Sequence, residues 1–384
     1  MATPQHAPGV YRLDMFPPPA QTLLAGVPAF LGYAGQGDIA RPAPLTLWPQ
    51  FEEQFGPQPA IGYLHCAVRG FFDNGGLMCY VVRLDPTATP PDALQAGLAA
   101  LADVTAVDLV CGPDIMPSPI PAVAPDAAAI AAVTGLQKQI LADCDRTGGR
   151  FAILDTVLTS DIPIVERQRT ALASDDGALY HPWLWVATPG GSGQYVPPCG
   201  HMAGIYSRSD QETGVQAAPA NEVVEGVLDL RVLLSDDDIG WLTAGGVNCL
   251  RASPGRGIRV WGARTLSADP AWRSVAARRV FLTMGRWLEA YLPQLAFEPN
   301  DLRLWVRITR ELTAYLDGLL QGGALKGRTP AEAFFVKCDS ETNPPDVTEA
   351  GMVVTKVGMA LADPAEFIIV RIIHGASGVS IQPT

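Results

Sequence analysis

Three short stretches carry residue types that could do chemistry, and each lacks part of what that chemistry needs. Gly190-Gly191-Ser192-Gly193 places a serine among glycines, but a hydrolase nucleophile needs a Gly-x-Ser-x-Gly turn directly after a strand. This composition favours a flexible linker. Gly255-Arg256-Gly257 is too short for either glycine-rich phosphate-binding fingerprint. Asp236-Asp237-Asp238 resembles a metal cluster, yet three consecutive side chains do not face one way, and a helix N-terminus explains them more simply.

The five histidines and seven cysteines form no recognisable ligand set. His65 adjoins Cys66, and His201 follows Cys199 by two positions, but a metal site would need further partners that the sequence does not reveal. A core or surface role is favoured for these histidines. The cysteines are odd in number and scattered singly, which favours buried free thiols over disulfides. We therefore expect no metal, no cofactor and no enzymatic activity.

Composition and charge restrict the partners. Only 17% of the 384 residues are charged, below the roughly 25% of ordinary soluble domains. A chain that buries much surface against its own copies can tolerate that composition. The net charge of −12 argues against nucleic acid as a partner. Residues 251–310 nevertheless hold eleven arginines against four carboxylates, which is either a docking face for an acidic partner or a solvated helix surface.

The first half predicts an extended arm followed by an α/β domain. Residues 1–22 are rich in proline, but Gly9 to Leu13 alternate like a short strand. Residues 23–195 then alternate predicted strands and helices, including a helix over 48–55 and a buried strand over 151–155. The glycine- and proline-rich stretch 187–198 predicts a domain boundary. Neither a signal peptide nor an apolar run of membrane-spanning length is present, so we expect folding in bacterial cytoplasm and no membrane insertion.

The second half, residues 196–362, predicts further strands and two strong amphipathic helices. The apolar stripe of the first helix runs from Trp272 to Tyr291 at spacings of three and four. The stripe of the second runs from Trp305 to Leu319, with Asn300 or Asp301 as its N-cap. Asp236 or Asp237 is the predicted cap of a shorter helix between predicted strands.

The last segment, residues 363–384, ends on an unusual strand. Phe367 to Ile373 is β-branched and almost wholly apolar, and a flexible Gly-Ala-Ser-Gly tail is predicted after it. Exposed at a sheet edge, such a strand would invite aggregation, so we expect it between other strands. The N-terminal strand and this one would both lack a neighbour, which is the arrangement that strand exchange between subunits requires. The predicted exchange residues are Val10, Tyr11, Leu13, Phe367, Ile369, Val370 and Ile372.

Several runs of the sequence, in one consistent order, resemble the phage tail sheath family. They cover nearly the whole chain, and the second half resembles the sheath C-terminal domain most closely. The runs are Pro8–Tyr11, Val27–Gly32, Tyr63–Leu84, Val196–Tyr206, Ala218–Asn221, Asn248–Arg251, Gly257–Leu266, Phe297–Asp301, Ala333–Asp339 and Pro364–Phe367.

This resemblance implies a structural subunit of mixed α/β fold. The family forms a helical sheath of stacked rings around an inner tube, built on a baseplate and closed by terminator or cap proteins. Neighbours are linked by exchanged arm strands that add to the inner domain, with the N-terminal α/β domain outside. The inner domain touches the tube, and by analogy the candidate contacts are the arginines of the two amphipathic helices: Arg273, Arg278, Arg279, Arg286, Arg303, Arg307 and Arg310.

The length favours some members of this family over others. A chain of 384 residues leaves no room for large outer decorations, which favours an extracellular injection particle, a pyocin-like tail or a small phage. A type VI secretion sheath is disfavoured, because those are two chains with a motif for an unfolding ATPase. The alternative from another class is an α/β small-molecule hydrolase or binding domain fused to an oligomerisation module. A tail tube protein is disfavoured by the two long amphipathic helices.

Overall fold

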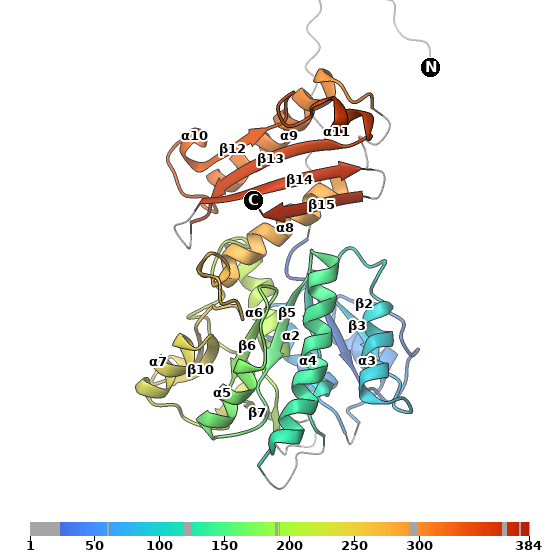
Figure 1. Cartoon of the computed structure of the whole chain (residues 1–384). Coiled ribbons are helices and arrows are strands. Elements are labelled where there is room, and N and C mark those ends of the chain that lie inside the picture. The colour runs from blue at the N-terminus through green and yellow to red at the C-terminus, as the bar shows by residue number, and fades with distance from the viewer. Residues whose placement is uncertain are drawn as a thin grey trace, which may run out of the picture.

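The computed structural model shows two stacked parts joined by one long helix (Figure 1). It describes residues 24–383 except 60, 119–123, 189–190, 192, 292–297, 363–366 and 376–377. The lower unit extends from residue 24 to residue 274 and holds the larger sheet. The upper unit begins at helix α8 and contains the C-terminal sheet. Within the described residues, none of the helices has the length and apolar character needed to cross a membrane.

The lower unit is a doubly wound α/β layer structure. Six consecutive strands of its eight-stranded sheet are parallel, and the end strands β2 and β11 are antiparallel to their neighbours. In spatial order the strands are β11 (Gly257–Trp261), β10 (Val247–Ser253), β6 (Gly177–His181), β5 (Phe151–Asp155), β4 (Leu109–Cys111), β1 (Pro28–Gly32), β3 (Cys79–Arg83) and β2 (Ala43–Leu45). The central strands are buried on both faces, as their continuous apolar runs predict.

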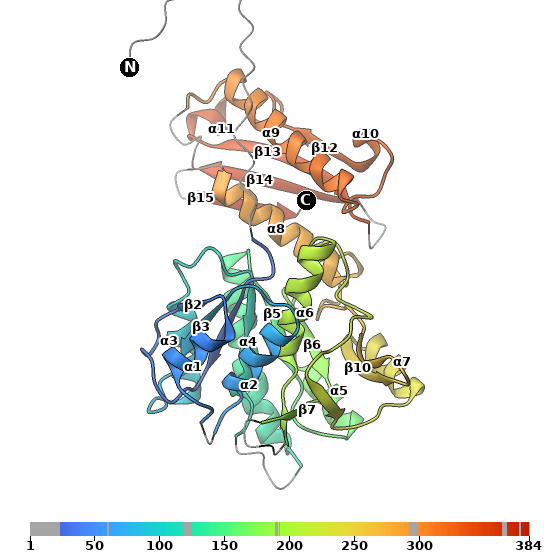
Figure 2. The same ribbon diagram turned by 180° about the vertical axis from the view of Figure 1, so that it is seen from behind.

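Helices cover both faces of this sheet (Figures 1 and 2). Helices α3 and α4 lie on one face, and α2 and α6 pack together on the other. The lower-unit helices are α1 (Trp48–Phe55), α2 (Leu64–Asp73), α3 (Pro90–Ala99), α4 (Ala127–Thr147), α5 (Ile162–Thr170), α6 (Cys199–Glu212) and α7 (Asp236–Ala244), with the short 3-10 helix η1 (Pro113–Ile115). A small antiparallel sheet adds β8 (Gly193–Val196), β7 (Leu184–Ala187) and β9 (Val227–Leu230).

Glycines let α2 and α6 approach closely. A Cβ atom at Gly200 would lie 2.2 Å from the Ala67 carbonyl oxygen, and one at Gly204 would lie 2.5 Å from the Phe71 carbonyl oxygen. These neighbours are backbone atoms of α2, so they cannot turn aside as a flexible side chain would. The one-turn spacing of the two glycines on α6 therefore fixes the distance between the helices.

Substituting Gly200→Ala is expected to lower the free energy of unfolding by about 1–3 kcal/mol, because the added methyl overpacks a backbone contact. The matched control is Gly135→Ala on α4, where an added Cβ would meet nothing within 4 Å. That substitution should stabilise by about 0.5–1 kcal/mol, since alanine loses less entropy in a helix. Thermal unfolding followed by tryptophan fluorescence measures both. An unchanged midpoint for Gly200→Ala would contradict the close approach.

The upper unit packs two helices on one four-stranded antiparallel sheet. Figure 2 shows α9 lying across the sheet on the side opposite to the view of Figure 1. The sheet order is β12 (Phe334–Lys337), β13 (Val353–Ala360), β14 (Phe367–Gly375) and β15 (Gly378–Pro383). The helices are α8 (Val275–Tyr291), α9 (Leu302–Gln321), α10 (Pro330–Ala333) and α11 (Pro345–Glu349), and the short 3-10 helix η2 (Pro270–Trp272) precedes α8 at the end of the lower unit. Met284, Leu288, Leu312 and Leu316 of the predicted stripes are buried in this core.

The structure corrects three sequence-based expectations. The boundary predicted between residues 195 and 196 falls inside the lower unit, because β10 pairs in parallel with β6 and continues the same sheet to residue 261. The tail predicted to be flexible after β14 instead forms a hairpin, in which Gly375 pairs with Gly378 and β15 follows. Helix α7 is capped by Ser235, not by Asp236 or Asp237, and Asp238 completes the capping box.

Candidate assembly site

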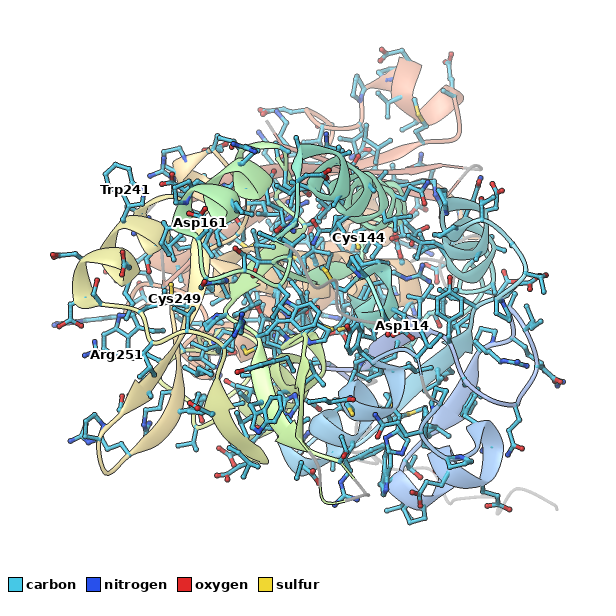
Figure 3. All side chains as sticks on the ribbon, turned by 90° about the horizontal axis from the view of Figure 1, so that it is seen from below. Asp114, Cys144, Asp161, Trp241, Cys249 and Arg251 are labelled. Atoms are coloured by element: carbon cyan, nitrogen blue, oxygen red, sulfur yellow. The ribbon has the colours of Figure 1, made fainter. Side chains whose placement is uncertain are left out.

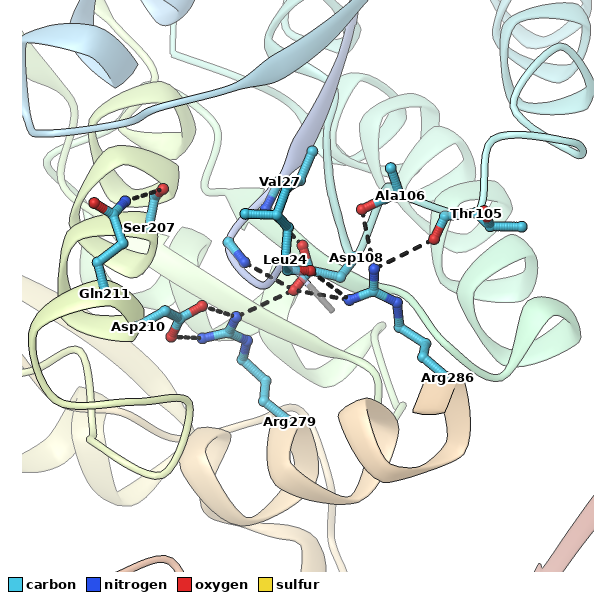
Figure 4. A network of polar contacts seen from close by, with 11 residues as sticks. Leu24, Val27, Thr105, Ala106, Asp108, Ser207, Asp210, Gln211, Arg279 and Arg286 are labelled. Atoms are coloured by element: carbon cyan, nitrogen blue, oxygen red, sulfur yellow. Dashed lines mark hydrogen bonds and ion pairs between the residues drawn. The ribbon is translucent and has the colours of Figure 1, made fainter. Parts of the chain in front are cut away.

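A buried group of charges joins the long helix α8 to the lower unit (Figure 4). The side chain of Arg279 is only 3% exposed, and its Nη1 donates to Asp210 Oδ1 on α6 at 2.8 Å. Its Nη2 lies 3.4 Å from Asp108 Oδ2, just before β4. The guanidinium carbon also lies 4.9 Å from the centre of the Tyr206 ring. Burial alone would lower the pKa of Arg279, but Asp210 and Asp108 outweigh it and raise that pKa.

Asp108 is the centre of this junction. Its carboxylate accepts the backbone N–H groups of Gly26 at 3.0 Å and Val27 at 2.6 Å. Arg286, seven residues after Arg279 on α8, places its Nη1 3.5 Å from Asp108 Oδ2. Arg286 also donates to three backbone carbonyl oxygens, those of Leu24, Thr105 and Ala106, at 3.3, 3.3 and 3.0 Å. Two arginines and two aspartates therefore neutralise one another in a buried interface, which fixes the orientation of α8.

A third arginine of α8 strengthens the same connection. Arg278 Nε donates to Asp176 Oδ1 at 2.7 Å, and the Asp176 side chain is 3% exposed. The guanidinium of Arg278 lies over the rings of Trp272 and Phe281, at 4.9 and 5.2 Å from their centres. Since Asp176 belongs to the lower unit, α8 is held there along three of its residues.

These contacts change the interpretation of the predicted tube-contact arginines. Arg279 and Arg286 are buried by contacts within the chain, and Arg278 is mostly buried, so none of the three presents its charge to a second protein in this conformation. The seven-residue spacing does place Arg279 and Arg286 on one face, but that face points into the lower unit. Arg273, Arg303, Arg307 and Arg310 remain exposed.

The carboxyl edge of the parallel strands is the usual place for an active site in an α/β fold. Asp155 ends β5, and its Oδ1 accepts the backbone N–H of Cys199 at 2.8 Å. His181 ends β6, and its Nδ1 lies 2.8 Å from Thr156 Oγ1. Trp183, which is 1% exposed, donates to the Thr156 carbonyl oxygen and covers this edge. With Asp155 and His181 at 2% and 0% exposure, these groups hold backbone and neighbouring side chains and are closed to a substrate.

Asp155 gives the lower unit a pH dependence. Burial raises the pKa of Asp155 to about 7, from an ordinary value near 4. Between these two values the folded chain holds a proton that the unfolded chain has lost. Stability is therefore greatest at the acidic side of this window and falls as the pH rises through it. The pKa of His181, lowered by burial to about 3, has the opposite effect, because the unfolded chain takes up the proton first as the pH falls.

Substituting Asp155→Asn removes the titration of this one carboxylate. Asparagine resembles the protonated acid and keeps an oxygen that accepts the Cys199 N–H. We expect the stability of the variant relative to the unmodified chain to rise as the pH rises from about 4 to about 7, by about 1.4 kcal/mol for each pH unit. His181 is present in both proteins and cancels in the difference. Thermal midpoints across this range measure it, with the exposed Asp103→Asn as control. A difference that does not change with pH would contradict the raised pKa of Asp155.

Three members of the two predicted histidine–cysteine pairs meet at one cavity, and the fourth, Cys199, lies elsewhere, beside Asp155. His65 and Cys66 of α2 and His201 of α6 line a space of about 590 Å³, beside Trp48 and Arg69. His65 is 5% exposed, and within the described part of the chain neither of its ring nitrogens has a hydrogen-bond partner. Cys66 accepts a hydrogen bond from Gln194 at 3.0 Å. Among the described residues no group of three or more histidine, cysteine or acidic side chains is arranged to hold a metal ion.

The C-terminal sheet contains part of the predicted strand-exchange set. Phe367, Ile369, Val370 and Ile372 lie in β14, which pairs with β13 over eight residues and with β15 on its other side. The expectation that this strand lies between other strands is confirmed. Ile372 is 3% exposed and belongs to the upper core. Val10, Tyr11 and Leu13 lie outside the described residues.

Comparison with known proteins covers both units. Residues 123–266 match the family model of the phage tail sheath protein central domain, and residues 267–373 match that of the phage tail sheath C-terminal domain. The division between the two lies close to the start of α8 at residue 275. A sheath chain of the anti-feeding prophage, solved as its contracted helical sheath, is 30% identical. The match covers 95% of this chain and 98% of that one, with a TM-score of 0.75.

Other relatives agree. The contracted sheath complex of an extracellular contractile injection system, PVC, is 28% identical over 96% of this chain and 97% of that one, with a TM-score of 0.71. A putative prophage major tail sheath protein of Pseudomonas aeruginosa (strain UCBPP-PA14) is 25% identical over 178 residues, which is 44% of either chain. The chain thus matches less than half the length of that curated relative. A sheath tail protein of Desulfitobacterium hafniense, 11% identical with a TM-score of 0.66, shares the fold.

The chain has a mixed α/β fold, and a buried charged junction joins its two units. The two family models cover residues 123–373, well over half of the 384, and the chain belongs to the phage tail sheath family. It is a sheath subunit of a contractile injection system. The resemblance identified in the sequence is confirmed, and the alternative of a hydrolase fused to an oligomerisation module is not favoured.

Proposed function

We propose that copies of this chain polymerise helically around an inner tube through exchanged strands, and that the polymer contracts to drive the tube through a target envelope. The observation that supports this most strongly is the 30% identity, over 95% of the chain, to a sheath solved in its contracted helical state. The further partners would be the inner tube protein, a baseplate, and terminator or cap proteins. Assembly would take place in the bacterial cytoplasm, within a phage tail or a phage-tail-like particle.

The N-terminal strand would supply one link between copies. Val10, Tyr11 and Leu13 belong to an alternating segment that suits addition to the edge of a sheet. The upper unit offers such a sheet, whose end strands are β12 and β15. Main-chain hydrogen bonds at that edge would give a link that survives while side-chain contacts between copies are remade.

The C-terminal strand would supply the second link by changing partners. In the isolated chain β14 pairs with its own β13, with Val357 opposite Val370 and Gly358 opposite Ile369. The same register made with the β13 of a neighbouring copy would be an exchanged strand, and it would keep every main-chain hydrogen bond of the pair. Phe367, Ile369, Val370 and Ile372 would then belong to the exchanged strand.

The outer face of α9 would contact the tube. Arg303, Arg307 and Arg310 are exposed on this helix, together with Leu302 and Val306, which are 66% and 58% exposed. Arg307 pairs with Glu298, and Arg310 lies 2.7 Å from Glu311 with 71% of its side chain exposed. Exposed ion pairs contribute only about 0–1 kcal/mol each, so such contacts would release as the sheath moves along the tube. Arg273, also exposed, would be a further contact.

Contraction would need no cofactor and no nucleotide. The free energy would be the difference between two packings of the same subunits, an extended one trapped on the tube and a denser one. The charged junction on α8 suits this role, because it keeps the two units of a subunit together while contacts between subunits change. Force applied at the upper unit would then move the lower unit with it.

Negative-stain electron microscopy of the purified full-length chain tests the proposal. Hollow striated tubes are expected, because sheath subunits of this family assemble on themselves. Discrete monomers or small closed rings at every protein concentration would contradict it.

A further inference from the structure

The junction that holds α8 also holds the chain just after the N-terminal arm. Residues 24–27, which we call the arm root, lead directly into β1, a central strand that pairs with β3 and β4. The Asp108 carboxylate accepts two backbone N–H groups of the arm root at 2.6 and 3.0 Å. The carbonyl oxygen of Leu24 accepts a hydrogen bond from Arg286 at 3.3 Å. One carboxylate and one guanidinium therefore connect the arm root with α8 (Figure 4).

Gly26 gives the arm root a path that a larger residue could not follow. Its φ of +72° lies in the left-handed region, which favours glycine. An added Cβ atom would lie 2.6 Å from Ser207 Cα and 3.0 Å from Asp210 Oδ2, both on α6. Asp210 in turn binds Arg279 of α8. The arm root therefore runs in close contact with the carboxylates that hold α8, and its path depends on theirs.

The arm root lies at the edge of the large sheet that faces the upper unit. Asp108 precedes β4 and contacts α8, whereas Asp114 follows β4 at the opposite edge. Figure 3 views the molecule from the side of that opposite edge, where Asp114 is labelled. Figure 1 shows the first described residues entering the lower unit beneath α8. A pull on the arm would therefore reach the sheet through β1 and reach α8 through Arg286.

Arg286 can hold two chain segments at once, because a guanidinium presents several N–H donors in one plane. In this chain it donates to the Leu24 oxygen in the arm root and to the oxygens of Thr105 and Ala106 before β4. The side chain is 7% exposed, so little water can replace these partners. Movement of the arm root would remove one acceptor from Arg286 and two donors from Asp108. We therefore expect the arm root and α8 to loosen together.

We infer that the N-terminal arm and α8 share one anchor, so that a neighbouring copy that holds the arm also holds α8 and the upper unit that α8 begins. Asp108 and Arg286 are positioning residues in this arrangement, because they act through the arm root and not by touching the neighbour. Binding at the arm and closure of the junction then favour each other, and weakening the junction weakens assembly. The inference rests on the proposed function, in which the arm links copies of the chain.

The protein concentration needed for tube formation tests the shared anchor. It is measured by sedimentation of full-length chains, at a temperature at which thermal unfolding shows every variant to be folded. We expect Arg286→Met to raise this concentration about tenfold, the factor that corresponds to the loss of one hydrogen bond to a charged group. Gly26→Ala should raise it as well, because alanine displaces the arm root. The two substitutions combined should raise it no further than the stronger one alone, since both release the same anchor.

The matched control is Gly200→Ala, which lowers stability through the contact of α2 with α6, near the start of α6 and away from the arm root. An equal rise for Gly200→Ala and Arg286→Met would overturn the shared anchor and leave the proposed function standing, because general destabilisation would then explain both. Effects of Arg286→Met and Gly26→Ala that multiply in the double variant would also overturn it, since independent sites add in free energy. Absence of tubes from the unmodified chain at every concentration would refute the proposed function, and the anchor would fail with it.

Discussion

Substituting Arg279→Met is expected to lower the free energy of unfolding by about 3–5 kcal/mol, the cost of leaving a buried charge without its partner. Methionine keeps most of the volume and removes the charge. Asp210 then loses the guanidinium that holds both of its carboxylate oxygens, while its side chain stays 2% exposed. Asp108 keeps Arg286 and two backbone N–H groups, so the loss is concentrated at Asp210. Thermal or denaturant unfolding measures the effect.

A second substitution separates the charge effect from a packing effect. Arg279→Met combined with Asp210→Leu removes both charges, and replacing a buried pair by apolar groups is often neutral. The double variant should therefore recover most of the lost stability. Arg303→Met, on an exposed position of α9, is the matched control and should change stability by no more than about 0.5 kcal/mol. Equal stability of Arg279→Met and the unmodified chain would show that the junction does not hold α8.

In the buried charged junction, the helix could be predicted from the sequence, but the partners of its arginines could not. The helix α8 and its apolar stripe follow from a local pattern, and the spacing of Arg279 and Arg286 correctly places them on one face. The partners of these arginines cannot be predicted from a local pattern, because Asp108 lies 171 residues before Arg279 in the chain. Nothing near Asp108 or Asp210 indicates an arginine partner. Two arginines beside an apolar stripe could have suggested burial with carboxylates, since a buried guanidinium needs them.

The elements with strong local signals were predicted well. The bounds of α1 and β5 agree with prediction to the residue, and Asp301 is the cap of α9 as one of two predicted candidates. The predicted boundary near residue 195 is wrong. The strands β6 and β10 lie on either side of the glycine- and proline-rich stretch 187–198, yet they pair in one sheet. The strand β15 was missed, although Val379 and Ile381 alternate with polar residues, since six residues after a glycine turn give a weak signal.

The lower unit also explains why its fold does not imply an enzyme. Its parallel sheet has the architecture of many α/β enzymes, and polar residues end β5 and β6 at the edge where such enzymes bind substrates. In this chain, Asp155 accepts the backbone N–H of Cys199 at the start of α6, and His181 contacts Thr156 just after β5. Trp183 donates to the carbonyl oxygen of the same Thr156. The chemistry-bearing side chains thus stabilise the unit.

Deleting residues 1–15 is expected to abolish tube formation while leaving the rest of the chain folded. The deletion removes Val10, Tyr11 and Leu13, the proposed link to a neighbouring sheet. The described residues 24–383 make their sheets and both cores among themselves, so the thermal midpoint should change little. Negative-stain images of the truncated and full-length chains at equal concentration measure the loss. Deleting only residues 2–7 is the matched control, because it shortens the arm and keeps the strand-like segment from Gly9 to Leu13.

The two deletions distinguish a strand link from a general need for the arm. Tubes from the shorter deletion and none from the longer one would locate the link in residues 8–15, as main-chain pairing to a neighbour requires. Tubes from both would show that other contacts between subunits hold the polymer without the N-terminal strand. In that case β14 would be the remaining candidate for exchange, and substituting Val370→Pro, which removes a ladder donor opposite Val357, would become the decisive variant.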